Sequence, residues 1–179
     1  MARSSARVAA MQLVYEKLMG GSGEGTLGQL IDFAPEGDDQ LFIDSMVAGV
    51  AAHAEELDAL VAKYSPARGL ERIARVDLCI LRVALYEMQH GGDVPESIVI
   101  NEAVELAKRF SEPSSVRFIN GVLGAVSRGE KPEDRIKEQV REKRTVHIEK
   151  VDRIVLNDKP AVKAAAVSDA PKAEDTSEE

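Results

Sequence analysis

Apolar residues recur at helical spacing through most of the first 128 positions of this 179-residue chain, and no alternating strand pattern competes with them. Breaks rich in glycine, proline and serine separate the helical segments. The pattern predicts helices at about residues 2–19, 26–33, 38–63, 70–90, 95–110 and 114–127. These boundaries describe an all-α protein.

One of these segments is apolar on nearly all of its sides. Between residues 73 and 88, apolar positions surround most of the helix instead of forming a single stripe; they include Ile73, Val76, Leu78, Ile80, Leu81, Val83, Leu85 and Met88. A helix of this kind is usually buried among others. We therefore expect it in the middle of the bundle.

The composition supports a compact bundle followed by a tail. Hydrophobic residues make up 44% of the chain but aromatic residues only 4%, so Ala, Leu and Val fill the core and favour close helix packing. We expect one domain at residues 1–129, built as two halves of three to four helices each. Residues 130–179 are charged and of low complexity, and we expect them to be largely disordered.

Residues suited to catalysis or metal binding do not form a recognisable pattern. His53, His90 and His147 have no Cys or His neighbour at metal-ligand spacing, and the glycine-rich run at 20–25 lacks the Lys that would hold a nucleotide phosphate. Cys79 sits in an apolar helix, where a small buried side chain is the simplest interpretation. We expect no catalytic residue, no metal and no cofactor.

The sequence also lacks the features of membrane insertion or export. No apolar run is long enough to span a bilayer, and no apolar signal segment follows the first residues. A single cysteine suits a reducing compartment. We therefore expect a cytoplasmic protein with no membrane partner.

Three ordered segments carry a family resemblance. They read ILRVALYEM, INEAVELAKRF and RFINGVLGAV, and they lie between residues 73 and 126. In this order they resemble the carboxy-terminal half of the NusB family of bacterial transcription antitermination factors. The resemblance implies binding of boxA-type single-stranded RNA in ribosomal RNA leader transcripts. It also implies the ribosomal protein NusE as a partner, and assembly with NusA and NusG on RNA polymerase.

The resemblance also implies an RNA-binding set, which comprises Arg3, Arg7, Tyr15, Asp77, Arg117 and Phe118. Arg3 and Arg7 are four residues apart and share a helix face. An aromatic ring beside an arginine, as at Phe118, can stack an unpaired base. For Tyr15 and Phe118 the residues alone leave core packing equally open.

The formal net charge of −8 argues against nucleic acid only if it is spread evenly. The last sixteen residues hold five acids against Lys172 and so carry half of this charge, which leaves room for a basic face elsewhere. Two other functions stay open. The chain could be a stand-alone relative of the RNA-binding domain of a ribosomal RNA cytosine methyltransferase. It could also be a helical interaction module with no RNA role.

Overall fold

The computed structural model describes residues 2–22, 37–92 and 94–130. Over these residues the protein forms six α-helices and one short 3-10 helix, with no strand. Their bounds are α1 (Ala2–Leu18), α3 (Asp38–Ala52), α4 (Ala54–Tyr64), η1 (Leu70–Arg72), α5 (Arg75–His90), α6 (Glu96–Phe110) and α7 (Pro113–Ser127). The all-α class is confirmed, whereas the helix expected at 26–33 and the tail from residue 131 lie outside the described residues.

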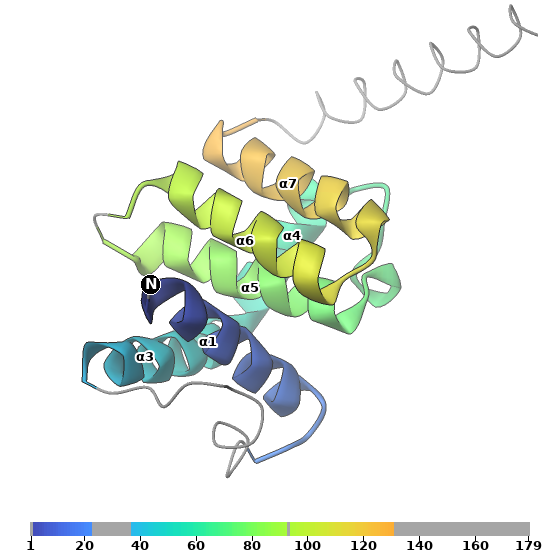
Figure 1. Ribbon diagram of the computed structural model, residues 1–179. Coiled ribbons are helices and arrows are strands. Elements are labelled where there is room, and N and C mark those ends of the chain that lie inside the picture. Colours follow the sequence, from blue (N-terminus) through green and yellow to red (C-terminus); the bar gives the residue numbers. More distant parts are fainter. Residues whose placement is uncertain (1, 23–36, 93, 131–179) are drawn as a thin grey trace, which may run out of the picture. The chain divides into compact units, whose positions relative to one another are not determined.

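Helix α5 occupies the centre of the bundle, as its apolar sides predict. It packs against α1 and α3 on one side and against α4, α6 and α7 on others (Figure 1). Leu81 and Leu85 are completely buried in it, and so is Cys79. Burial raises the pKa of the Cys79 thiol to about 11, so it stays neutral and acts as a core side chain.

The expected helix at 38–63 is wrong, because the chain breaks at His53 into α3 and α4. His53 leaves helical geometry, with φ −109° and ψ 17°, while its backbone N–H still donates to Gly49 O. The break lets α4 reach α5 and α7 while α3 stays against α1 and α5. Gly49 matters here, since a Cβ at this position would lie 1.9 Å from the Tyr86 ring.

The start of α7 also differs from the prediction. The helix begins at Pro113, one residue before the predicted start, at the N-terminal position that suits proline. No side-chain hydrogen bond caps it. Ser115 instead donates to Asp77 of α5 at 2.6 Å. A bond between two helices thus takes the place of a local cap.

The central helix should dominate stability. Leu81→Ala or Leu85→Ala removes a completely buried side chain and should lower the free energy of unfolding by about 2–5 kcal/mol in urea denaturation. Leu41→Ala is the control, since Leu41 on α3 is 69% exposed and should change the value by less than about 0.5 kcal/mol. A loss below about 1 kcal/mol at both α5 positions would contradict the burial of α5.

Candidate nucleic-acid interface

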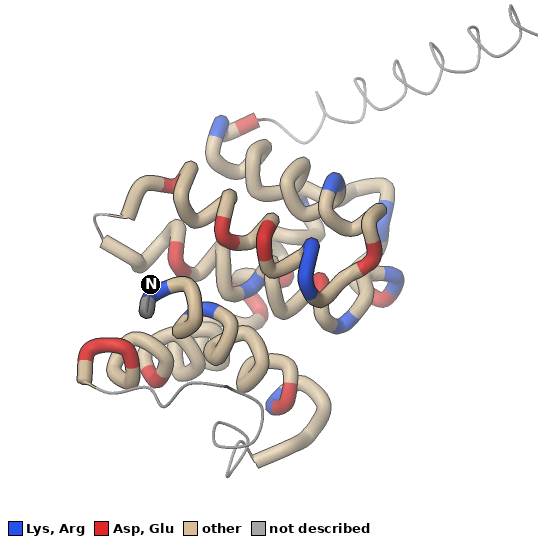
Figure 2. The backbone as a smooth tube through the Cα atoms, in the orientation of Figure 1, with Lys and Arg blue, Asp and Glu red and all other residues tan. Residues whose placement is uncertain are grey.

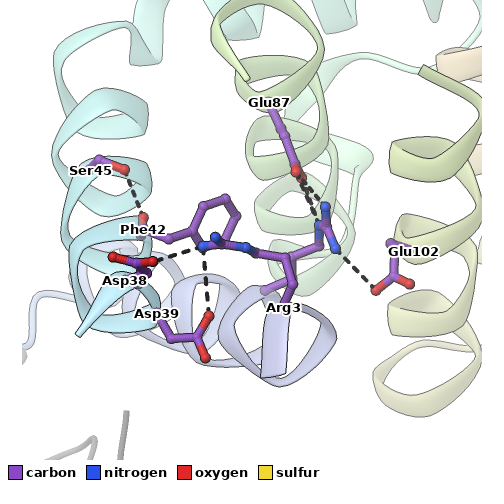
Figure 3. A network of polar contacts seen from close by, with 8 residues as sticks. Arg3, Asp38, Asp39, Phe42, Ser45, Glu87 and Glu102 are labelled. Atoms are coloured by element: carbon purple, nitrogen blue, oxygen red, sulfur yellow. Dashed lines mark hydrogen bonds and ion pairs between the residues drawn. The ribbon is translucent and has the colours of Figure 1, made fainter. Parts of the chain in front are cut away.

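Arg7 of α1 lies inside the protein. Its Nε donates to Glu87 Oε2 at 2.9 Å and its Nη2 to Glu87 Oε1 at 2.6 Å, while Nη1 lies 3.6 Å from Glu102 (Figure 3). The hydrogen bond to Glu87 raises the pKa of Arg7 despite the opposing effect of burial. The guanidinium is therefore a charged link from α1 to α5 and α6.

Arg3 lies one helical turn earlier and is about half exposed. Its Nη1 donates to the backbone oxygen of Asp38 at 3.4 Å and lies 3.7 Å from the Asp39 carboxylate. The guanidinium also lies over the Phe42 ring, 4.6 Å from its centroid (Figure 3). Arg3 and Arg7 thus both have partners within the protein, and RNA contact by either stays a prediction.

Asp77, another residue of the implied set, is almost completely buried in the first turn of α5. One carboxylate oxygen accepts the hydrogen bond from Ser115, and no donor within the described ranges reaches the other. This contact ties the starts of α5 and α7 together. Asp77 therefore positions the beginning of α7, where Arg117 and Phe118 lie, and has almost no surface of its own.

Phe118 is neither core nor free surface. The half-buried ring packs against the core, and the guanidinium of Arg68 lies over it, 4.6 Å from the centroid. Arg117 beside it is exposed and lines a groove of about 380 Å³ between α6 and α7. Asn101 and Asn120 line the same groove. The neighbouring residues Arg117 and Phe118 thus face two different parts of the surface.

Tyr15 lines a hollow that measures about 610 Å³. The hollow lies between α1, the start of α5 and the end of α6, with Met19, Val76 and Phe110 in its lining. Tyr15 is 38% exposed and Met19 is 60% exposed. The side-chain oxygen of Gln12, also in the lining, is buried and accepts no hydrogen bond within the described residues.

The structure divides the implied RNA-binding set into two regions. Val76, near the start of α5, lines the hollow together with Tyr15. The adjacent Asp77 accepts a hydrogen bond from Ser115 at the start of α7, the helix that carries Phe118. Tyr15, Asp77 and Phe118 therefore all lie around the start of α5. Arg7 meets α5 at Glu87, ten residues further along, which is about 15 Å of helix. Arg3 and Arg7 therefore lie at the opposite end of α5.

Sequence reasoning missed two exposed arginines, Arg68, which lies over the Phe118 ring, and Arg75, which begins α5. They belong to the stretch ARGLERIAR, residues 67–75, which contains three arginines against the single acid Glu71. That local excess of charge was a usable signal. Figure 2 shows Lys and Arg positions gathered at the end of the bundle where α6 ends and α5 and α7 begin (compare Figure 1).

Other kinds of site find no support in the part of the chain that the structure describes. No group of three His, Cys, Asp or Glu side chains is placed there to hold a metal ion. Within the same ranges, no helix has the length and apolar character needed to cross a bilayer.

The sequence matches the NusB family over residues 4–128. A protein of Symbiobacterium thermophilum named "Transcription antitermination protein NusB" is 42% identical over 141 residues, which cover 73% of this chain and 92% of that protein. A protein of the same name from Acetivibrio thermocellus is 41% identical over 128 residues, 70% of this chain and 88% of that protein.

Solved structures agree at the level of the fold. NusB of T. maritima has a TM-score of 0.64 at 26% identity, covering 75% of this chain and 96% of its own. A structure of antitermination factors NusB and NusE with double-stranded RNA has a TM-score of 0.62 at 22% identity, covering 72% and 97%. The fold is thus that of the bacterial antitermination factors. The chain belongs to the NusB family, which confirms the resemblance seen in its sequence.

Because Arg7 is buried and paired with Glu87, its substitution should lower the stability of the fold. Arg7→Ala leaves Glu87 buried without its partner and should lower the free energy of unfolding by about 3–5 kcal/mol. The double variant Arg7→Met/Glu87→Met should recover most of this loss, because neither charge then remains. Arg3→Ala should cost less than about 1 kcal/mol, because the Arg3 side chain is about half exposed. Equal losses for Arg3→Ala and Arg7→Ala in urea denaturation would contradict this assignment.

Proposed function

We propose that this protein is a transcription antitermination factor that binds boxA-type RNA of ribosomal RNA leader transcripts together with the ribosomal protein NusE. With NusA and NusG it joins RNA polymerase in the cytoplasm and keeps transcription processive. It acts by assembly, not by catalysis. The observation that carries the proposal is the 42% identity over most of both chains to a protein named for antitermination.

The surface at the α5 start supports the RNA part of the proposal. Phe118 offers a partly exposed ring with the Arg68 guanidinium over it, and Arg117 offers a second exposed cation in the neighbouring groove between α6 and α7. Aromatic rings stack unpaired bases, and arginines neutralise phosphates, so this combination suits single-stranded RNA. Asp77 holds the ring in place through Ser115.

The hollow beside Tyr15 supports the protein part. Met19 and Tyr15 are among the few large apolar side chains that are exposed within the described residues, and both line this hollow. Exposed apolar surface around a concave site is typical of a protein interface. The unbonded side-chain oxygen of Gln12 adds an acceptor for a partner's N–H group. We place NusE on this side of the α5 start.

RNA binding should depend on the partner and on salt. In a gel-shift titration with a boxA-type RNA, we expect NusE to raise the affinity of the full chain, since two linked contacts act together. Arg117→Ala should weaken binding and reduce the slope of log affinity against log salt by about 0.7, the value for one lost phosphate contact on a single strand. No binding with or without NusE would overturn the proposed function.

Phe118→Ala should separate stacking from packing. Loss of a stacked base should lower RNA affinity by about 1–3 kcal/mol. Because the ring is only half buried, the loss of folding free energy should stay below the about 3–5 kcal/mol typical of a core Phe. Both quantities are measured on the same variant, by RNA titration and urea denaturation.

Phe42→Ala is the matched control for this prediction. Phe42 is also half buried, with the arginine Arg3 over its ring, but it lies on α3 near the α1 start. It should lose stability to a similar extent and keep its RNA affinity once folded. Equal losses of RNA affinity in the Phe118 and Phe42 variants would show that the ring of Phe118 has no special role.

A further inference from the structure

Arg68 is held at a defined place on the connector between α4 and α5. Its backbone N–H donates to Ser65 O at 3.0 Å, and the Ser65 hydroxyl donates to Arg68 O at 3.1 Å. Ser65 itself is buried. A tight turn anchored in this way fixes the direction from which the side chain leaves the connector, and that side chain reaches the ring of Phe118 on α7.

The guanidinium of Arg68 has no carboxylate partner within the described residues. In this it differs from Arg3, Arg7 and Arg82, which also contact other helices. Arg3 and Arg7 also lie near an aromatic ring, that of Phe42, but both are paired with acids. Arg82 is paired with Asp58. At Arg68 the ring is the one contact of the guanidinium that the structure gives. Its charge is therefore available to a ligand.

Two further exposed cations lie at the starts of α5 and α7. Arg75 begins α5, two residues before Asp77, and Arg117 lies two residues after Ser115 on α7. The hydrogen bond between Asp77 and Ser115 brings these helix starts together. Both arginines are exposed, and neither has a carboxylate partner within the described residues.

We infer that Arg68 is a further RNA-contacting residue of this protein. Its guanidinium and the Phe118 ring form one stacking platform. An unpaired base stacks on the outer face of the guanidinium, while Arg75 and Arg117, on the starts of α5 and α7, meet other phosphates of the same strand. Arginine suits this position because its planar group stacks on rings and bases, which an ammonium cannot do. The inference rests on the proposed function, since it presupposes that the α5 start binds RNA.

The test uses the full chain with NusE and a boxA-type RNA that carries 2-aminopurine at one position at a time. In the unmodified protein, one position should be quenched on binding, as expected for a stacked base. Arg68→Ala should lower RNA affinity about fivefold or more and abolish most of the quenching. Arg68→Lys keeps the charge and should keep the salt slope, but it should still lose the quenching, which separates stacking from charge.

Arg72→Ala is the matched control. Arg72 is an exposed arginine of the same connector, but it lies 3.8 Å from Glu71 and the structure gives it no ring contact. Its variant should bind within twofold of the unmodified protein. Circular dichroism checks that each variant is folded.

Failure of the proposed function and failure of the inference give different results. If the unmodified protein with NusE does not bind the RNA, the proposed function fails. If it binds and Arg68→Ala binds equally well or more tightly, Arg68 only covers the ring, and the inference alone is overturned. Equal losses in the Arg68 and Arg72 variants would also overturn it, since they would report general charge and not the platform.

Discussion

Helix α5 is buried against every other α-helix that the structure describes, yet it carries the charged residues Asp77, Arg82 and Glu87. They are spaced five residues apart. At 3.6 residues per turn, each step of five rotates the side chain by about 140°, so the three point to different sides of the helix. One helix thus presents a polar group to each of three neighbours.

Each of these groups is matched by a different helix. Asp77 accepts a hydrogen bond from Ser115 of α7, Arg82 binds Asp58 of α4 at 2.8 and 2.7 Å, and Glu87 binds Arg7 of α1. A buried charge left without its partner costs about 3–5 kcal/mol, so a shift of one helix that separated such a pair would lower the free energy of unfolding by about that amount. The register of the bundle around α5, and with it the position of Phe118, depends on these three contacts.

The same contacts explain which parts of the fold could be predicted from the sequence. Apolar periodicity located the helices and the buried α5, but it could not show the break at His53, because apolar spacing continues on both sides of it. Nor could it pair polar groups that are far apart in the chain. Arg7 and Glu87 are eighty residues apart, so sequence reasoning placed Arg7 on a surface with Arg3.

The candidate site, like the fold, could be predicted only in part from the sequence. The family resemblance pointed to Phe118, but the residues alone could not decide between packing and stacking, and the half-buried ring shares features of both. Arg68 lies fifty residues earlier, on a connector with no helical pattern of its own. Its contact with Phe118 exists only because α4, α5 and α7 meet at one end of the bundle, which periodicity does not specify.

The arrangement also makes the proposed RNA binding compatible with an acidic chain. Arg7 and Arg82 are committed to carboxylates inside the bundle, whereas Arg68, Arg75 and Arg117 are exposed near the α5 start. Net charge therefore says little, because attraction over a Debye length of about 8 Å depends on the local patch. The hollow beside Tyr15 adjoins the same helix start through Val76. In the proposed complex, a protein held in that hollow would add its own surface next to the RNA, so a patch of few arginines would become sufficient once the partner is bound.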